Sequence, residues 1–315
     1  MTGYDLGDKT VNSELPAIHL AGPTAVGKSA IALELAERLR GEIITVDSMQ
    51  VYRGLDIGTA KPSREESARV PHHLIDVVDL SKSFDVAQFI SLARCAESDV
   101  RSRGHLPIFC GGTGFYFKAL FDGLSTTPPS DTALRLELES TPMPQLLEEL
   151  ARRDSNAYAA IDRQNPRRVI RALEVIRLTQ RPYADFLPPK NTTKTRNFFV
   201  LNCPAAELNE RIHRRVDGML KLGLVEETRV LLNQGLRENK TALQALGYRQ
   251  VTDYIDGKHT FLQTVDLIKS RTRQFAKRQL TFFKHQFNAH WIDHSKTNSA
   301  KTVDLLLGEL DNPQS

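Results

Sequence analysis

The chain is poor in cysteine and in long apolar runs. Its three cysteines, Cys95, Cys110 and Cys203, are far apart and form no C-x-x-C pair. This spacing supports neither a zinc site nor a disulfide framework, and it fits a reducing compartment. No stretch approaches the length that a membrane span requires, and residues 1–14 lack the basic start and apolar run of a signal peptide. These absences predict a cytoplasmic protein that has no contact with a membrane.

The net charge is also low. A formal charge of +4 over 315 residues does not by itself prove a nucleic-acid partner, although it permits one where positive charge is locally concentrated. The remaining composition, with 40% hydrophobic and 25% charged residues, is that of an ordinary globular protein. The length allows one large domain or two smaller ones. Nothing in the sequence requires more than a monomer.

The first third of the chain alternates apolar runs with helical periodicity. Buried strands are predicted at Ala17–Ala21, Glu42–Val46, His73–Val78 and Leu106–Cys110. Helices are predicted from about Lys28 to Arg40, with Gly41 as the stop, and from about Asp85 to Arg103. This alternation predicts a parallel sheet that is covered by helices.

The pattern changes after Leu124. Residues 125–130 form a loop rich in Ser, Thr and Pro, and the chain from there to about Arg181 has helical periodicity without a convincing strand. Asn165-Pro166 is a good helix start, because an N-cap residue precedes proline at the first helical position. This part of the chain is therefore predicted to be helical.

The sheet resumes at Phe198–Cys203, and long helices fill most of the remaining chain. We therefore predict an α/β fold with a core and an insertion. The core is a parallel sheet flanked by helices, formed by residues 15–124 and 196–315. Residues 125–195 form an all-helical insertion domain.

A phosphate-binding motif follows the first predicted strand. The segment matches G-x-x-x-x-G-K-[ST] and consists of Gly22, Pro23, Thr24, Ala25, Val26, Gly27, Lys28 and Ser29. In this motif the glycines let backbone N–H groups converge on phosphate oxygens, the helix start adds a positive dipole, and the lysine supplies a full charge. The Ser29 hydroxyl is placed to bind the Mg²⁺ that accompanies a polyphosphate. The segment predicts a P-loop enzyme and leaves the phosphate compound open.

The second predicted strand ends in an acid, Asp47. In a doubly wound sheet ligands lie at the carboxyl ends of the strands, so Asp47 is expected to face the same crevice as Lys28. A carboxylate beside a bound diphosphate is suited to removing a proton from an incoming nucleophile. An aspartate in this place also serves as a Mg²⁺ ligand in P-loop nucleotide hydrolases, or as a cap at a strand end. The residue types alone leave these three roles open.

Seven segments occur in one order across nearly the whole chain. They are GPTAVGKS at 22–29, DSMQVYRGLDIGTAKP at 47–62, HHLIDVVD at 72–79, GGTGFYFKALFDGLS at 111–125, NPRRVIRALEVIRLT at 165–179, ALGYRQ at 245–250 and RQFAKRQLTFFK at 273–284. Together they resemble the bacterial tRNA dimethylallyltransferases. The first segment is generic, whereas the second is highly specific to that family.

The resemblance implies a donor and an acceptor. The P-loop would hold the diphosphate of dimethylallyl diphosphate together with Mg²⁺, no ATP would be consumed, and Asp47 would be the general base. The acceptor would be the exocyclic N6 of the adenine just 3′ of the anticodon in tRNA. Thr113 would contact the target nucleotide, although a threonine in a Gly-Gly-Thr turn also caps a following helix. Catalysis is thus assigned to Asp47, Lys28 and Thr113.

The resemblance also assigns residues to tRNA contact. Besides Thr113, they are Asp47, Ser48, Met49 and Gln50, then Arg167, Arg168, Val169, Ile170 and Arg171, then Gln244, Ala245, Leu246, Gly247, Tyr248 and Arg249. An anticodon loop is suited to recognition through splayed and stacked bases, and the target base leaves its stack to reach Asp47. We expect the insertion and the core to close around the anticodon stem-loop.

Two basic segments supply positive charge. Residues 163–181 contain six arginines against Glu174 alone, and this density favours phosphate contacts. Residues 267–292 contain six Lys or Arg and no acid, interleaved with Phe275, Phe282, Phe283 and Trp291. We predict a helix over this second segment, with its aromatic residues in the core. Its lysines are either RNA contacts or a solvated face.

Four arginines are candidates for the diphosphate. Arg211 and Arg215 are four residues apart on a predicted helix and therefore share a face. By resemblance Arg215 lies near the diphosphate, and Arg211, Arg273 and Arg278 are weaker candidates.

Three alternative functions remain open. A transferase with the same chemistry could act on free AMP or ADP, but a mononucleotide does not require an arginine-rich helical insertion. An ATP-dependent small-molecule kinase is compatible with the P-loop and is disfavoured by the segment around Asp47. A non-catalytic RNA-binding module does not explain an intact P-loop with Lys28 and Asp47 in place.

Overall fold

The computed structural model describes residues 16–188, 197–295 and 299–311. These residues fall into two compact units, which we call the core unit (16–119 and 197–311) and the helical unit (120–188). Residues 1–15 and 189–196 lie outside the described ranges. The predictions about a signal peptide and about the domain boundaries partly depend on them. Within those ranges, no helix is both long and apolar enough to cross a bilayer.

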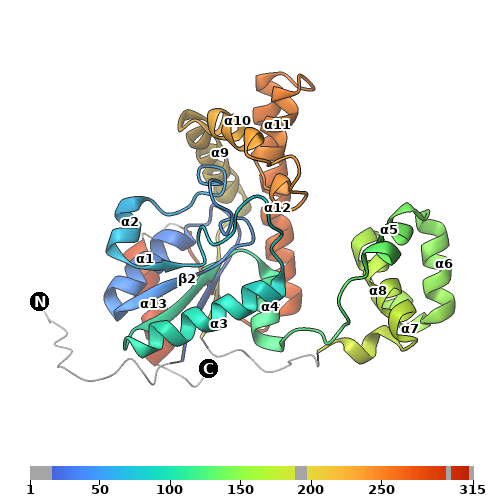
Figure 1. Cartoon of the computed structure of the whole chain (residues 1–315). Helices are drawn as coiled ribbons and strands as arrows, with labels where there is room; N and C mark the ends of the chain where they lie inside the picture. Colours follow the sequence, from blue (N-terminus) through green and yellow to red (C-terminus); the bar gives the residue numbers. More distant parts are fainter. Residues whose placement is uncertain (1–15, 189–196, 296–298, 312–315) are drawn as a thin grey trace, which may run out of the picture. The chain divides into compact units, whose positions relative to one another are not determined.

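The core unit is built on a sheet of six parallel strands in the order β3-β2-β4-β1-β5-β6 (Figure 1). The strands are β1 (Ile18–Ala21), β2 (Gly41–Val46), β3 (His72–His73), β4 (Leu106–Gly111), β5 (Phe198–Asn202) and β6 (His290–Asp293). Strands β2 and β4 are buried along their whole length, as expected for strands that are covered on both faces. The predicted parallel sheet is confirmed.

The strand order reverses at β1. Strands β2, β3 and β4 lie on one side of β1, whereas β5 and β6 lie on the other. Open sheets of this kind bind ligands in the crevice outside the carboxyl ends of the strands, at the point of reversal. We therefore expect the ligand site at the residues that follow β1, β2 and β4.

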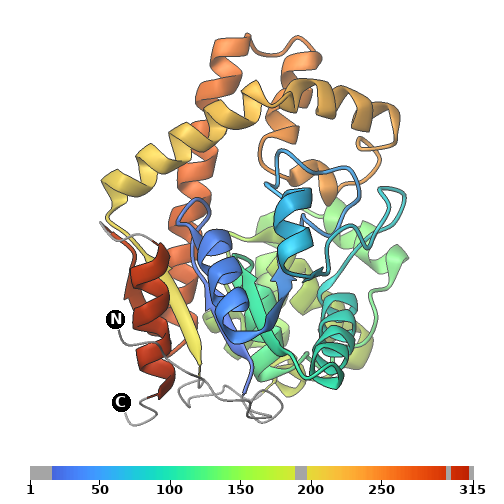
Figure 2. The same ribbon diagram turned by 90° about the vertical axis from the view of Figure 1, so that its left-hand side faces the viewer.

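The core unit contains helices around and beyond this sheet. They are α1 (Lys28–Leu39), α2 (Arg64–Arg69), α3 (Val86–Ser102), α4 (Gly114–Asp122, which runs across the division between the units), α9 (Ala205–Lys221), α10 (Leu224–Asn233), the 3₁₀ turn η2 (Ala242–Gln244), α11 (Tyr248–Ile255), α12 (Phe261–Gln286) and α13 (Ser299–Asp311). Helices α1 and α13 lie side by side in Figures 1 and 2, and α9 packs along α12. Helix α3 begins as predicted, because the Asp85 side chain accepts from the Gln88 N–H and caps it.

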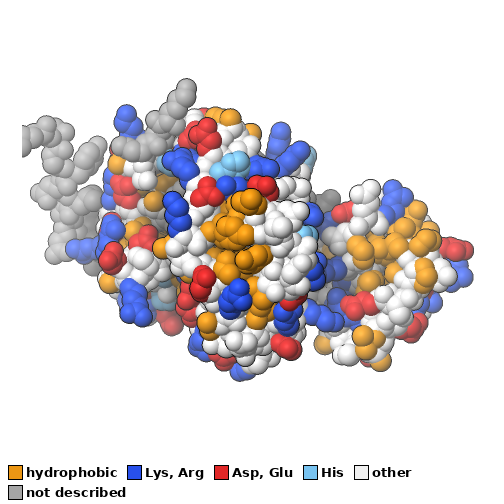
Figure 3. Space-filling view, turned by 90° about the horizontal axis from the view of Figure 1, so that it is seen from above, with side chains coloured by type: hydrophobic (Ala, Val, Ile, Leu, Met, Phe, Trp, Pro, Cys, Tyr) orange, Lys and Arg blue, Asp and Glu red, His pale blue; other side chains and the backbone are white. Residues whose placement is uncertain are grey.

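The surface of the core unit seen from above has no large area of only positive or only negative charge. Figure 3 shows an apolar patch on this face, with basic and acidic side chains interspersed around it. The small net positive charge is therefore not concentrated there.

Two boundaries differ from the predictions at β2 and β3. Arg40, rather than Gly41, takes the left-handed conformation that ends α1, with φ of 49°. Gly41 is instead the first residue of β2, where a Cβ would lie 2.8 Å from Ile108 Cδ1. The strand predicted over His73–Val78 is only His72–His73, because Leu74 (φ 63°) and Asp76 (φ 54°) turn the chain out of the extended conformation.

The helix predicted to continue to residue 292 ends at Gln286, and this prediction was wrong beyond that point. Phe287 is extended, and His290–Asp293 pairs with β5 as the edge strand β6. Trp291 and Ile292 favour a strand, and Ile292 is buried while Trp291 is 40% exposed. The prediction that Trp291 is a core residue is therefore also wrong.

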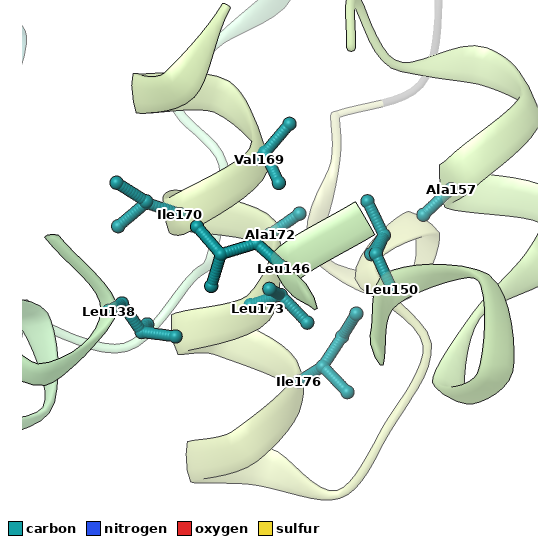
Figure 4. Close-up of a cluster of buried hydrophobic side chains, with 9 residues drawn as sticks. All are labelled: Leu138, Leu146, Leu150, Ala157, Val169, Ile170, Ala172, Leu173 and Ile176. Atoms are coloured by element: carbon teal, nitrogen blue, oxygen red, sulfur yellow. The ribbon is translucent and has the colours of Figure 1, made fainter. Parts of the chain in front are cut away.

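The helical unit consists of helices and loops in its described residues. They are the C-terminal turn of α4, then α5 (Thr132–Ser140), α6 (Met143–Arg153), α7 (Ser155–Ala160), α8 (Pro166–Thr179) and the 3₁₀ turn η1 (Tyr183–Phe186). Helix α8 begins as predicted, with the Asn165 side chain accepting from the Arg168 N–H. Its apolar face contributes most of the buried cluster in Figure 4, formed by Leu138, Leu146, Leu150, Ala157, Val169, Ile170, Ala172, Leu173 and Ile176.

A buried carboxylate lies near the amino end of β2, away from the crevice. Glu42 is 1% exposed and accepts hydrogen bonds from Arg103 at 2.9 and 2.7 Å, and its oxygens lie 2.6 Å from His73 Nε2 and from His105 Nδ1. Burial alone would raise the pKa of Glu42, but the hydrogen bonds from Arg103, His73 and His105 outweigh it and lower the pKa to about 2. The ionised form of Glu42 therefore stabilises the fold.

Glu42→Gln is expected to lower the free energy of unfolding by about 3 kcal/mol at pH 7, because it leaves Arg103 without its counter-charge. The pKa of Glu42 in the folded chain, about 2, lies below its ordinary value of 4.5. The stabilisation is thus fully present above pH 4.5 and is lost as the pH falls toward 2. Urea unfolding at several pH values measures it. A difference between wild type and variant that stays constant down to pH 2 would contradict the assignment, and Glu65→Gln on α2 is the exposed control.

Candidate active site

The P-loop lies between β1 and α1, as predicted. Gly27 has φ of 106°, and a Cβ there would lie 3.0 Å from His294 Nε2, so both the backbone conformation and the space favour glycine. Gly22 passes close to β5, where a Cβ would lie 2.8 Å from the Leu201 carbonyl oxygen. The Val26 side chain is fully buried. The loop is therefore fixed by its surroundings before any ligand binds.

Arg211 supports this loop from α9. Its Nη1 donates to the Val26 carbonyl oxygen at 2.7 Å, and its Nη2 donates to Glu207 at 2.5 Å and to the His294 carbonyl oxygen at 3.3 Å. Arg211 lines neither of the cavities described below. Its position is that of a residue that holds the loop.

Two cavities lie at the carboxyl end of the sheet. The P-loop cavity, about 340 Å³, is lined by Lys28, Ser29, Gln50, His72, Cys110 and Gln279, among others. The distal cavity, about 310 Å³, is lined by Ser48, Met49, Thr113, Gln244, Ala245, Leu246, Gly247 and Arg278, among others. Five residues line both cavities: Thr24, Asp47, Thr59, Arg215 and Phe275. The acid and one of the candidate arginines thus stand at the junction of two binding spaces.

Asp47 follows β2 and is held by its own backbone turn. Its Oδ1 accepts from the Met49 N–H at 2.8 Å and from the Gln50 N–H at 3.3 Å. Burial raises the pKa of Asp47, and these two hydrogen bonds together with Lys28 and Arg215 offset only part of that rise. A carboxylate with a raised pKa and a fixed orientation is a better proton acceptor than an ordinary aspartate.

Two cations face Asp47. Burial lowers the pKa of Lys28 to about 8, with Arg215 contributing to the fall and Cys110 and Asp47 opposing it. Burial also lowers the pKa of Arg215, against the effect of Asp47. Lys28 Nζ donates to the Pro23 carbonyl oxygen at 2.7 Å, and Arg215 Nη2 donates to the Thr59 carbonyl oxygen at 3.5 Å. Two desolvated cations beside a P-loop form a site for a polyanion.

Thr113 lies where it was predicted, in the turn after β4. Its Oγ1 accepts from the Ser48 N–H at 3.1 Å, which joins the turn to the residue after Asp47. Its carbonyl oxygen also accepts the Tyr116 N–H at 2.9 Å at the start of α4. The side chain lines the distal cavity, so both predicted roles fit its position.

Gln279, which the sequence did not single out, and Phe275, which was predicted to be a core residue, both line the P-loop cavity. Gln279 is 8% exposed; its Oε1 accepts from the Thr24 N–H at 2.9 Å, and its Nε2 donates to the Gly112 carbonyl oxygen at 2.8 Å. It thereby ties α12 to the P-loop and to the turn that carries Thr113. Phe275 is one helical turn earlier and lines both cavities. The signal in the sequence was Gln279 itself, a polar residue on the side of the predicted helix that carries the aromatic residues.

The cations of α12 have several surroundings. Lys269 Nζ pairs with Asp217 of α9 at 2.6 Å, and Arg273 Nη1 lies 2.5 Å from His213 Nε2. Arg278 lines the distal cavity, with its guanidinium 5.9 Å from the centre of the Phe275 ring. Arg271 is exposed and donates to Gln274. Of the three weaker arginine candidates, only Arg278 borders one of the two cavities.

Four residues assigned to tRNA contact have buried side chains, namely Val169, Ile170, Ala245 and Tyr248. Val169 and Ile170 belong to the apolar cluster of the helical unit, 0% and 7% exposed, whereas Arg167 and Arg168 of the same helix are exposed. Tyr248 has no exposed surface, although Gln244–Gly247 before it line the distal cavity and Arg249 after it is exposed. The Val169, Ile170 and Tyr248 side chains therefore face the interior in this structure, and their assignment to tRNA contact stays a prediction.

Arg171 has a structural role in the helical unit. It donates to Glu174 at 2.7 Å, to Thr127 Oγ1 at 2.9 Å and to the Pro128 carbonyl oxygen at 2.6 Å. Glu174 is fully buried and also accepts the Asp131 N–H at 3.0 Å. Arg171 and Glu174 thus hold the 127–131 loop on α8.

Two family models match most of this chain. Residues 50–286 match the IPP transferase family model, and residues 16–82 match the isopentenyl transferase model. A tRNA dimethylallyltransferase from an Exiguobacterium species is 44% identical over 88% of this chain and 90% of its own length. One from Corynebacterium jeikeium is 42% identical over 94% of this chain and 97% of its own length.

Solved structures give the same result. The tRNA isopentenylpyrophosphate transferase from Bacillus halodurans superposes with a TM-score of 0.68 at 40% identity, covering 94% of this chain and 96% of that one. A eukaryotic dimethylallyltransferase acting on tRNA superposes with a TM-score of 0.74 at 25% identity, covering 95% of this chain and 80% of that one. Because the matches span nearly the whole chain, the protein belongs to the tRNA dimethylallyltransferase family.

Proposed function

We propose that this protein transfers the dimethylallyl group from dimethylallyl diphosphate to N6 of the adenine that is 3′-adjacent to the anticodon in tRNA, and releases diphosphate. The observation that carries the proposal is the position of Asp47, which lines both the P-loop cavity and the distal cavity. In this reaction the dimethylallyl donor and the attacking amine must meet beside the group that removes the proton from the amine. Asp47 stands at such a junction.

The donor is assigned to the P-loop cavity. The P-loop N–H groups and the start of α1 bind the diphosphate, with the positive charge of Lys28 and Arg215 beside it. This charge stabilises the diphosphate as it leaves the allylic carbon. The protein acts here by binding and orienting the donor.

The divalent ion assigned to this site is Mg²⁺. The Ser29 hydroxyl lines the same cavity as the Asp47 carboxylate, and hard oxygen donors of this kind fit Mg²⁺, which takes its other ligands from phosphates and water. Among the described residues there is no group of three or more His, Cys, Asp and Glu side chains that could form an all-protein metal site. When bound, Mg²⁺ would neutralise charge on the diphosphate.

The acceptor is assigned to the distal cavity. The amine of adenine is a weak nucleophile because its lone pair is delocalised into the ring, so removal of a proton by Asp47 during attack raises its reactivity. Thr113 and Gln244–Gly247 line the space where the base would lie. An adenine in tRNA would have to leave its stack to enter.

We place the enzyme in the cytoplasm as a monomer.

Arg167→Ala and Arg168→Ala are expected to weaken tRNA binding, because both arginines are exposed at the start of α8 and are assigned to phosphates. Each loss of a phosphate contact should flatten the plot of log affinity against log salt concentration by about one unit. Filter binding between low and high salt measures both effects. Arg152→Ala, which removes an exposed arginine from α6 of the same unit, is the matched control. Equal effects of all three substitutions would contradict a specific role for Arg167 and Arg168.

The rival donor is ATP. Incubation of the protein with Mg²⁺, tRNA and either ATP or dimethylallyl diphosphate distinguishes the two, because a kinase releases ADP and a prenyltransferase releases diphosphate. We expect diphosphate from dimethylallyl diphosphate and no ADP. Release of ADP on turnover would overturn the proposed function.

A further inference from the structure

Tyr248 connects two parts of the core unit that the proposed reaction brings together. Its fully buried ring packs on Gly58 so closely that a Cβ at that glycine would lie 2.4 Å from Tyr248 Cε2. Its hydroxyl donates to Glu227 Oε1 at 2.5 Å and accepts from the Gly58 N–H at 3.0 Å. The proposed reaction does not use this side chain, whose hydroxyl has two hydrogen-bond partners.

Glu227 of α10 completes the contact. Its two carboxylate oxygens lie 3.1 and 3.0 Å from the Ile57 nitrogen and accept its N–H. Burial and then Glu227 raise the pKa of Tyr248, so the hydroxyl stays protonated and donates. Two successive N–H groups of the 56–60 segment are therefore held by one pair of side chains from α10 and α11.

The 56–60 segment in turn holds residues at the junction of the cavities. The Thr59 carbonyl oxygen accepts from Gln50 Nε2 at 3.0 Å and from Arg215 Nη2 at 3.5 Å. Thr59 lines both cavities, whereas Tyr248 and Glu227 line neither. Tyr248 directly follows Ala245-Leu246-Gly247, which line the distal cavity. A continuous set of contacts thus runs from the acceptor side, through Tyr248, to the arginine on the donor side.

We propose that Tyr248 and Glu227 are positioning residues, which hold the 56–60 segment so that Thr59 orients Arg215 and Gln50 beside Asp47. The proposal rests on the proposed function, because the orientation of Arg215 affects turnover only where a diphosphate lies beside it. The pair acts through the backbone of the segment and does not touch either substrate.

Tyr248→Phe tests the proposal, because it keeps the ring and removes both hydrogen bonds of the hydroxyl. Amide hydrogen exchange at Gly58 is expected to accelerate by about tenfold or more, since its N–H loses the hydroxyl as acceptor. Exchange at Ile57 is expected to change less, because its acceptor, Glu227, remains. The KM for dimethylallyl diphosphate is expected to rise about tenfold, while the Kd for tRNA changes by less than about twofold. Tyr254→Phe is the matched control, as it removes a hydroxyl from the same helix, where the ring contacts Phe261 instead.

Each result decides the proposal. Unchanged exchange at Gly58 in Tyr248→Phe would overturn it. Faster exchange with an unaltered KM would also overturn it, because the contact would then be structural only. Glu227→Gln retains an acceptor for the Ile57 N–H and is expected to be affected less than Glu227→Ala. A wild-type protein without transfer activity would remove the proposed function, and the exchange comparison would still decide whether the pair holds the segment.

Discussion

Asp47→Ala is expected to lower the rate of dimethylallyl transfer by about 10³-fold, within the range that a positioned general base supplies. The carboxylate is half-buried, has a raised pKa and borders both cavities, so no other described acid can take over its position. Binding of tRNA should persist, because the arginines assigned to phosphates are unchanged. A single-turnover transfer assay beside filter binding measures both quantities.

Asp47→Asn separates the base from its structural role. Asparagine keeps an oxygen that can accept from the Met49 and Gln50 N–H groups, but it cannot take up the proton. We expect Asp47→Asn to be as inactive as Asp47→Ala and to retain wild-type stability. Turnover close to that of wild type in either variant would remove Asp47 from the mechanism.

Lys28→Ala is expected to lower kcat/KM for dimethylallyl diphosphate by about 10²-fold, in the range reported for loss of one electrostatic contact to developing charge. Lys28 is one of two desolvated cations beside the P-loop, and its Nζ lies against the loop backbone. The Kd for tRNA should not change. Steady-state kinetics with the donor varied at saturating tRNA measure the effect.

Two further substitutions control this result. Lys28→Arg keeps the charge but not the compact ammonium, so it should restore only part of the activity. Lys277→Ala removes an exposed lysine from α12 and should leave donor kinetics unchanged. An equal loss in Lys28→Ala and Lys277→Ala would mean that Lys28 contributes only to the overall charge.

The strands were predictable where apolar runs are continuous. Strands β1, β2, β4 and β5 each contain a short apolar run, and the starts of α3 and α8 carry their own capping residues, Asp85 and Asn165. Strand β6 was missed because its residues follow a helical pattern without a turn signal, and its pairing partner, β5, lies some ninety residues earlier. The conformation of such a segment depends on a long-range contact that periodicity does not record.

The site was predictable as a set of segments rather than as single side chains. Consecutive residues of a motif point in different directions, so Arg167 and Arg168 are exposed on α8 while Val169 and Ile170 enter the apolar cluster. The hydrogen-bond partners of Gln279 could not be predicted from the sequence, because Thr24 and Gly112 belong to other elements. The motifs identify where chemistry occurs, and packing decides which members take part.

The most direct test of the account is a transfer assay with radiolabelled dimethylallyl diphosphate, Mg²⁺ and unmodified tRNA, run beside AMP and without ATP. A second tRNA, in which the adenine 3′ of the anticodon is replaced by guanine, serves as the control acceptor. We predict label in the first tRNA alone. Label in AMP would keep the chemistry and contradict the RNA acceptor, and no label in any acceptor would contradict the central claim that Asp47 joins this donor to this base.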